Sequence, residues 1–480
     1  MTAAPAFANP PAASLRPLAR GETPPLPPAE TAESIVAKAK LSGRVGFAVA
    51  DVKSGQILEE SASDLGLPPA SVTKAVTALY ALDALGEAHR FETKVVVTGQ
   101  LANGIVTGDL VLAGGGDPTL DTDGLAEMAA ELKRMGVREV RGRFLVWGGA
   151  LPESFEIDNL QPVQVGYNPA VSGLNLNYNR VHFEWKRAGS GWKVTMDARS
   201  EKYRPDVDVA RMVVQDRRAP IYTYVDRGTH DSWTVASNAL GKGGARWLPV
   251  RKPALYAGEV FRTLARSHGI VLQAPQSVGA LPQGRTLVNR RSGPLREVIR
   301  DMLLYSTNIT AECVGLSATA ARLRHPPASL AASAAEMSAW AANTLGMGES
   351  RFVDHSGLGD RSRMTAAGMA TALVRARERG LGPLMKTIPM RDGRGRPVKD
   401  HPISVRAKTG TLNFVSCLAG YMTAPDGREM AFAILAGDPA RRDTLTEAQR
   451  ERPEGAGSWN ARAKTLQLNL IERWGSVYAS

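Results

Sequence analysis

Cysteine and clustered histidine are scarce in this chain. Its 480 residues include only two cysteines, Cys313 and Cys417, and seven histidines that show no metal-ligand spacing. Protein zinc sites need closely spaced Cys, His, Asp or Glu ligands, so we expect no metal and no other cofactor. Two thiols suit a cytosolic protein, and they equally suit an exported protein that avoids disulfides. Whether the two cysteines pair cannot be decided from their positions.

Long apolar runs are also missing. A membrane-spanning helix needs about 18 apolar residues or more, and no such stretch occurs, so we expect no transmembrane segment. Residues 1–28 are rich in Ala and Pro but lack the charged and apolar regions of a complete signal peptide. Ala6-Phe7-Ala8 nevertheless has the small residues of a cleavage site. We therefore expect an exported, periplasmic protein whose numbering begins late in its export signal, with residues 1–28 as a flexible tether.

A dense basic block is absent, although the formal net charge is +12. Lys and Arg are spread along the whole chain, which argues against a nucleic-acid partner. A basic surface also attracts anionic polymers such as peptidoglycan, whose stem peptides end in carboxylates. The glycine-rich run at 114–118 lacks the Gly-Lys-Ser/Thr ending of a phosphate-binding loop, so we interpret it as a turn.

Hydrophobic patterning predicts several units, since 480 residues exceed one ordinary core. Alternating runs at 45–52 and 56–60 indicate a β-hairpin, and three more strands are expected at 403–408, 416–423 and 430–435. These strands predict an α/β (α+β) fold: a five-stranded antiparallel sheet flanked by helices, with two nested domains inserted between the chain ends. The expected divisions are 1–28 (flexible N-terminal segment), 29–90 with 286–480 (main domain), 91–180 with 251–285 (inserted domain II) and 181–250 (nested β-rich domain III).

The first of three short motifs is a Ser-x-x-Lys at 71–74. Ser71 precedes an apolar helical pattern, where backbone N–H groups lack partners, and Lys74 follows on the same helical face. Burial of this helix lowers the lysine pKa, as a base for Ser71 requires. The alternative is a serine cap followed by an ordinary lysine whose charge reaches solvent. A second copy, Ser190 to Lys193, has glycines on both sides of its serine and no helical pattern after it, so we favour Ser71 as the nucleophile.

The second motif, Ser306-Thr307-Asn308, lies between two helical patterns. A hydroxyl here would relay a proton from Lys74 to a leaving amine, and the Asn308 amide would hold a backbone carbonyl of the substrate. The alternative is a helix cap, for which all three residue types are suited. A further Ser-x-Asn at 458–460 lies beside the terminal helix, where capping explains it.

The third motif, Lys408-Thr409-Gly410-Thr411, follows the β-branched strand at 403–408. The Lys408 ammonium and the two threonine hydroxyls are suited to bind a terminal carboxylate, and Gly410 lets the substrate approach the backbone closely. A backbone N–H of this motif, with that of Ser71, would form an oxyanion hole worth roughly 3 kcal/mol per donor.

The three motifs in this order are those of penicillin-binding proteins and serine β-lactamases. Over residues 30–475 the chain resembles the class C low-molecular-mass penicillin-binding proteins, the D-alanyl-D-alanine carboxypeptidase/endopeptidase family. The resemblance includes the large insertion after the first motif and three local runs: Gly-Gly-Asp-Pro-Thr-Leu at 115–120, Asp-His-Ser-Gly-Leu at 354–358, and Val-Arg-Ala-Lys-Thr-Gly-Thr-Leu at 405–412.

The resemblance implies a penicillin-recognising α/β domain with two nested smaller domains, located in the periplasm or outer cell wall. It assigns Ser71 as nucleophile, Lys74 as base, Ser306 and Asn308 as the second element, and Lys408 and Thr409 as the third. Thr307 stands where the family more often has Asp or Cys, which leaves the reaction class intact.

We therefore predict a serine D-alanyl-D-alanine carboxypeptidase/endopeptidase that hydrolyses peptidoglycan stem peptides or cross-links through an acyl-enzyme on Ser71. The expected partners are these stem peptides and β-lactam antibiotics, which should acylate Ser71. One alternative is a β-lactamase or esterase of the same fold, for which Glu336 and Glu349 are candidates for the deacylating base by distance alone. The other is a non-catalytic cell-wall-binding module. The sequence leaves open the balance between carboxypeptidase and endopeptidase activity and the oligomeric state.

Overall fold

The principal sheet of the molecule joins the two ends of the chain. The computed structural model describes residues 30–479, and its largest sheet is antiparallel with the strand order β17-β18-β19-β20-β1-β2. Strand β1 pairs with β20 along its whole length, which places the N-terminal hairpin beside the last strands. The strands are β1 (Arg44–Asp51), β2 (Ile57–Ser61), β17 (Lys386–Thr387), β18 (Ser404–Leu412), β19 (Val415–Thr423) and β20 (Glu429–Gly437).

The predicted count of five strands was one short, because β17 adds a sixth at the edge. This strand has only two residues, Lys386 and Thr387, which pair with Ala407 and Arg406 of β18. Two residues are too few to display the alternation by which a strand is recognised in sequence. Beyond Ala407, no strand within residues 30–479 pairs with this edge of β18.

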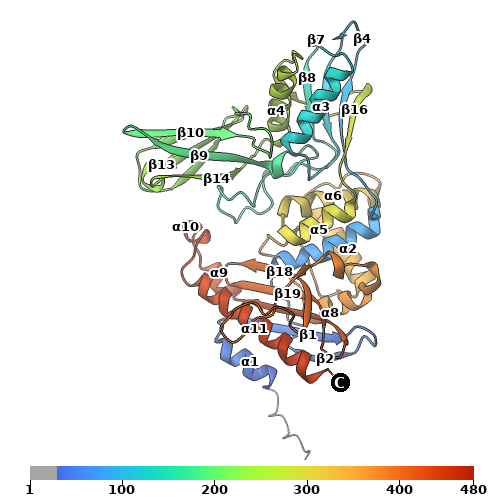
Figure 1. Cartoon of the computed structure of the whole chain (residues 1–480), viewed down its shortest axis with the longest axis vertical. Helices are drawn as coiled ribbons and strands as arrows, with labels where there is room; N and C mark the ends of the chain where they lie inside the picture. The colour runs from blue at the N-terminus through green and yellow to red at the C-terminus, as the bar shows by residue number, and fades with distance from the viewer. Residues whose placement is uncertain (1–29, 480) are drawn as a thin grey trace, which may run out of the picture.

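Helices cover both faces of this sheet (Figure 1). Helices α1 (Ala32–Ala39) and α11 (Ala456–Val477) pack on one face, where Trp474 contacts Phe47 and Phe432. The other face is covered by a second group of helices, whose central member α2 has a run of nine fully buried residues from Thr73 to Ala81. That group is α2 (Thr73–Leu85), α5 (Leu295–Tyr305), α6 (Asn308–Leu323), α7 (Leu330–Trp340) and α8 (Ala366–Arg375).

The region between α2 and α5 forms a second body at the opposite end of the molecule from α11 (Figure 1). Its five-stranded sheet has the order β15-β8-β6-β3-β16 and packs against two helices, α3 (Thr122–Arg134) and α4 (Pro253–Ser267). Beside it lies a small sheet of β4 (Leu101–Ala102), β5 (Ile105–Val106) and β7 (Glu139–Val140). The larger sheet contains β3 (Glu92–Val97), β6 (Leu110–Gly114), β8 (Phe144–Trp147), β15 (Pro275–Ser277) and β16 (Arg285–Arg291).

A β-rich module extends sideways from this second body (Figure 1). Two three-stranded sheets build it, and its buried Phe183 and Trp233 belong to the same apolar core as α3 and α4. The first sheet has β9 (Arg180–Ala188), β10 (Gly191–Asp197) and β14 (Gly243–Pro249), and the second has β11 (Ala210–Gln215), β12 (Tyr222–Asp226) and β13 (Asp231–Ala236).

Strand β16 pairs with β3 of the inserted sheet, so we propose to move the boundary expected at 285/286 to the end of β16, after Arg291. The predicted flexible segment 1–28 lies outside the described residues. Within residues 30–479, no helix is both long and apolar enough to cross a lipid bilayer.

Candidate active site

Ser71 lies where the principal sheet meets the helical layer. It belongs to a single 3₁₀ turn, Ala70–Val72, that leads directly into α2 at Thr73. Ala70 has a left-handed φ of 45°, a conformation that costs energy for a residue with a Cβ and is frequent at functional sites. Gly357 packs so closely here that a Cβ on it would collide with the Ala70 carbonyl. The turn before Thr73 was not visible in the apolar pattern, which predicted a helix beginning at Ser71.

Lys74 is fully buried and makes three hydrogen bonds. Its Nζ donates to Ser71 Oγ at 2.9 Å, to Asn308 Oδ1 at 2.7 Å and to the Ser356 carbonyl at 2.8 Å. Burial lowers the pKa of this lysine to about 8. The structure thus places a side chain that can lose its proton near neutral pH within hydrogen-bond distance of the serine hydroxyl.

Two buried carboxyl groups, Glu312 and Asp354, act on Lys74 electrostatically and fix the loop that contacts it. Glu312 of α6 accepts hydrogen bonds from the backbone N–H groups of His355 and Ser356, each at 2.9 Å. Asp354 accepts from the N–H groups of Gly357 and Gly359. These bonds fix the loop at 354–359 and hence the Ser356 carbonyl that contacts Lys74. Burial raises the pKa of both carboxyl groups, and their negative charges in turn raise the pKa of Lys74 against the effect of burial.

Sequence reasoning missed the part played by these carboxyl groups. The signal for Glu312 was present, since it is the only acidic residue in the helical pattern from Asn308 to Leu323. A lone acid in such a buried stretch normally has a partner. Asp354 belongs to the Asp-His-Ser-Gly-Leu run that carried the family resemblance, but nothing in the sequence indicated what the run contacts.

Lys408 and Ser306 form a second pair in the site. The Lys408 Nζ donates to Ser306 Oγ at 3.0 Å and to the Thr409 carbonyl at 2.7 Å, and the lysine is 2% exposed. Ser306 ends helix α5 in a left-handed conformation, with φ 60° and ψ 36°. Burial lowers the pKa of Lys408 well below its usual range, and the neighbouring charges of Lys74 and Lys386 act in the same direction.

The third motif lies inside a strand rather than at its end. We expected the strand to stop at Lys408, but β18 continues to Leu412, pairing with β19 throughout. Gly410 explains how the strand passes Ser71, since a Cβ there would lie 2.7 Å from the Pro69 carbonyl and 3.1 Å from the Ser71 nitrogen. Thr409 and Thr411 alternate with Lys408 and Gly410, so their side chains point to the opposite face of the strand.

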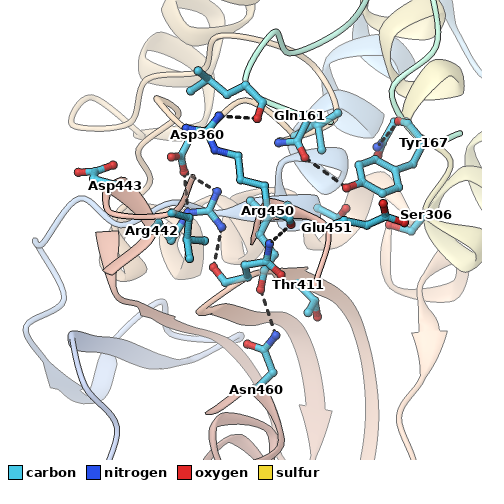
Figure 2. Close-up of a pocket in the computed structure, with 18 residues that line it drawn as sticks. Gln161, Tyr167, Ser306, Asp360, Thr411, Arg442, Asp443, Arg450, Glu451 and Asn460 are labelled. Atoms are coloured by element: carbon cyan, nitrogen blue, oxygen red, sulfur yellow. Dashed lines mark hydrogen bonds and ion pairs between the residues drawn. The ribbon is translucent and has the colours of Figure 1, made fainter. Parts of the chain in front are cut away.

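A cavity of about 460 Å³ opens beside Ser71 and contains Ser306, Asn308 and Thr411 in its lining (Figure 2). The inserted body contributes Tyr167 to the wall, and its backbone carbonyl accepts a hydrogen bond from Asn308 Nδ2 at 2.9 Å. The amide that we expected to hold a substrate carbonyl is therefore already engaged on both sides, by Lys74 and by the Tyr167 carbonyl.

The far wall of the cavity carries charges of both signs (Figure 2). Arg442, from helix α9 (Pro439–Asp443), forms an ion pair with Asp360 at 2.8 Å. Arg450, from helix α10 (Glu447–Arg450), donates to the Leu160 carbonyl of the inserted body. The acidic lining residues are Asp360, Asp443 and Glu451. None of these residues was identified from the sequence, because the segment at 438–451 shows only polar helical patterning.

The second Ser-x-x-Lys motif and the two candidate glutamates lie outside the cavity. Ser190 is in the turn between β9 and β10, and Lys193 is on β10 in the β-rich module. Glu336 and Glu349 are exposed and do not line the cavity. Asn460 differs from expectation: it lies within α11, lines the cavity, and donates to the Leu412 carbonyl at 3.0 Å instead of capping the helix.

Both cysteines are buried and unpaired. Within residues 30–479, no group of three or more His, Cys, Asp or Glu side chains is arranged to hold a metal ion.

Comparison with known proteins gives related chains and a related fold. The sequence model of the D-Ala-D-Ala carboxypeptidase 3 (S13) family matches residues 29–459. The chain is 26% identical over 450 residues to the D-alanyl-D-alanine carboxypeptidase of Actinomadura sp. (strain R39), covering 85% of this chain and 80% of that protein. It is 26% identical over 411 residues to D-alanyl-D-alanine carboxypeptidase DacB of Haemophilus influenzae, covering 81% and 84% respectively.

Among solved structures, penicillin binding protein 4 from Haemophilus influenzae superposes with a TM-score of 0.74 at 20% identity, covering 92% of this chain and 99% of that one. The same protein complexed with a novel β-lactam superposes with a TM-score of 0.71. The predicted fold class is thereby confirmed.

Proposed function

Since this chain belongs to the D-Ala-D-Ala carboxypeptidase 3 (S13) family, we propose that it hydrolyses the D-Ala-D-Ala ends of peptidoglycan stem peptides through an acyl-enzyme on Ser71. The enzyme class, a serine-type D-Ala-D-Ala carboxypeptidase, is that of the family. The observation that carries the role of Ser71 is its contact with Lys74, a buried amine with a pKa of about 8 placed 2.9 Å from the hydroxyl.

The reaction begins when neutral Lys74 takes the Ser71 proton and Oγ attacks the carbonyl carbon of the penultimate D-Ala. Asn308 and the Ser356 carbonyl keep Lys74 beside Ser71. We assign Asn308 a positioning role, because its Oδ1 holds Lys74 and its Nδ2 holds the Tyr167 carbonyl. The Ser71 N–H and a backbone N–H at the edge of β18 beyond Ala407 stabilise the developing oxyanion.

The C–N bond then breaks and the terminal D-Ala leaves as an amine. The proton that it needs passes through Ser306, which contacts Lys408 at 3.0 Å. Lys408 holds the substrate's terminal carboxylate together with Thr411, which lines the cavity beside Ser71 at the edge of β18. Thr409 lines a cavity on the other face of β18 and is not assigned to this contact. Water finally attacks the acyl-enzyme carbonyl, which releases the shortened stem peptide and restores Ser71.

We place this reaction in the periplasm, where peptidoglycan and β-lactam antibiotics are accessible. The net charge of +12 favours association with a polymer that carries many carboxylates. β-Lactams have the strained amide and the carboxylate that this site requires, so they should acylate Ser71 and leave slowly. Because Glu336 and Glu349 lie outside the cavity, no glutamate proposed from the sequence is positioned to speed deacylation.

The first test is an intact-mass time course after addition of benzylpenicillin, with Ser71→Ala measured in parallel. We expect a persistent adduct of the whole antibiotic on the wild type and none on the variant, with the same thermal unfolding for both. Rapid loss of the adduct while penicillin is consumed would instead indicate a β-lactamase. Absence of both adduct and consumption would indicate a non-catalytic wall-binding protein.

A further inference from the structure

The cavity beside the nucleophile is bridged by contacts between the main domain and the inserted body. Glu451, which follows α10, lines the cavity. Its carboxylate accepts a hydrogen bond from Gln164 Nε2 of the inserted body at 2.6 Å and forms an ion pair with Arg246 of β14 at 2.9 Å. The preceding residue, Arg450, donates to the Leu160 carbonyl at 2.5 Å. We call these contacts between residues 450–451 and the inserted body the latch.

The latch lies on the side of Ser71 toward which the acyl part of the substrate extends. Gly410 marks the point where β18 passes the Ser71 nitrogen. Lys408, which is proposed to hold the carboxylate of the leaving residue, precedes this point along the strand, and Asn413 follows it. Asn413 lines the cavity and donates to the Arg450 carbonyl at 2.6 Å. A substrate that lies along β18 with its carboxylate at Lys408 therefore extends toward the latch.

The size of the cavity separates two kinds of substrate. Its volume of about 460 Å³ is that of a site for a drug-sized ligand. A β-lactam or a short peptide ending in D-Ala-D-Ala is of this size. A stem peptide that is still attached to a glycan strand continues beyond Asn413, where the contacts of Glu451 with the inserted body cross its path.

The latch joins the two bodies by polar contacts between half-exposed side chains. The side chains of Arg246 and Glu451 are 26% and 33% exposed, and ion pairs of this kind contribute little to stability. The chain itself connects the bodies at 86–91 and 292–294. These two segments lie side by side, since the Phe91 N–H donates to Ser292 Oγ at 2.9 Å. Figure 1 shows them on the opposite side of the molecule from α10, an arrangement suited to hinge opening.

We propose that the latch controls access to Ser71. The closed cavity admits β-lactams and short peptides, and opening of the latch admits a stem peptide that is attached to a glycan strand. The inference rests on the proposed function and adds the size of the substrate that each state accepts. Glu451 and Arg246 are then specificity-determining residues, and Arg246 gives the β-rich module a part in substrate selection.

The first test weakens the latch from the inserted body. Arg246→Gln removes the ion pair, and Arg246 itself does not line the cavity. The matched control is Arg211→Gln, which removes another arginine of the β-rich module that pairs with Asp208 and lies outside the cavity. Two substrates share the same scissile bond: a short peptide ending in D-Ala-D-Ala, and soluble glycan strands that carry uncross-linked pentapeptides.

We expect Arg246→Gln to raise kcat/KM on the glycan strands about threefold through a lower KM, because the open state becomes more populated. The rate on the short peptide should stay within about 1.5-fold of wild type. The control variant should match wild type on both substrates.

The second test holds the latch closed. In Gln164→Cys/Glu451→Cys the two new thiols are joined by a bifunctional reagent that reduction cleaves, while both native cysteines are buried. The joined protein should cleave glycan strands at least tenfold more slowly than the same protein after reduction. The two forms should acylate with benzylpenicillin and cleave the short peptide at the same rate within about twofold.

Three results would overturn the latch alone: equal rates on glycan strands before and after reduction, equal changes on both substrates, or an Arg246 variant unchanged on the strands. A wild type that cleaves neither substrate and forms no penicillin adduct would overturn the proposed function itself.

Discussion

The two buried lysines of the site, Lys74 and Lys408, have opposite electrostatic surroundings. Lys74 has three hydrogen-bond acceptors, and the carboxyl groups of Glu312 and Asp354 lie behind it. Lys408 donates to Ser306 Oγ and to a backbone carbonyl, and the charges that act on it are those of Lys74 and Lys386. Burial lowers the pKa of both, but only Lys74 has nearby negative charge to offset it.

This difference assigns different tasks to two residues of the same type. The surroundings of Lys74 are complete without a ligand, so it is suited to exchange a proton with Ser71 and stay in place. The charged groups that act on Lys408 within residues 30–479 are lysines, so an incoming anion supplies the charge that its surroundings lack. One lysine acts as the base, and the other attracts the substrate.

The largest effect is expected from removing the base. Lys74→Met should lower the second-order rate of acylation by benzylpenicillin about 10³-fold, since general-base assistance contributes roughly 10²–10⁴-fold. This rate is measured by quenching the acylation reaction at successive times and determining the acylated fraction by intact-mass spectrometry. Lys53→Met, which changes an exposed lysine in a hairpin turn, serves as the control. Acylation of the Lys74 variant within tenfold of wild type would show that another group activates Ser71.

A smaller and more selective effect is expected from the second lysine. Lys408→Met should reduce kcat/KM on a peptide ending in a D-Ala carboxylate about tenfold more than on the same peptide ending in an amide. A charge-assisted hydrogen bond to a carboxylate contributes roughly 1.5–3 kcal/mol, and the amide substrate never forms it. Steady-state kinetics with the two peptides measures the difference. Equal losses on both would mean that Lys408 does not bind the terminal carboxylate.

The pH dependence of acylation reports on Lys74 directly. Neutral Lys74 is the active form, and its pKa is lowered to about 8 by burial. The acylation rate should therefore rise as pH increases toward about 8 and level off above it. Ser71 acylation measured from pH 6 to 10 with a fixed β-lactam concentration tests this. A rate that is flat through pH 8 would contradict Lys74 as the titrating base.

The smallest expected effect comes from the support of the base. Glu312→Gln removes a negative charge that raises the pKa of Lys74, so the midpoint of the acylation profile should move to lower pH. The new amide NH₂ would also face a backbone N–H, which should cost about 1–3 kcal/mol of folding free energy. Denaturant unfolding and the pH profile measure the two effects separately. If the midpoint of the acylation pH profile is unchanged while the free energy of unfolding falls, Glu312 only holds the 354–359 loop in place.

Prediction from sequence worked best where residues near one another in the chain carry the signal. The three short motifs identified the family, and the strand patterns at 45–52 and 416–423 predicted the fold class, both of which the comparisons confirm. It failed where contacts join distant segments. The two-residue strand β17, the part played by Glu312 and the charged wall at Arg442 and Arg450 depend on partners about 20 to 290 residues away.

The sequence by itself indicated the reaction class, because three short motifs in one order resemble those of the penicillin-binding proteins. Only the tertiary structure decided the environment of each lysine. A pKa depends on burial and on charges brought together from α2, α6, β17 and β18, and no single segment contains them. A cavity lined by Lys386 of β17 and Lys464 of α11 is likewise a product of folding, since it forms only when α11 packs on the sheet.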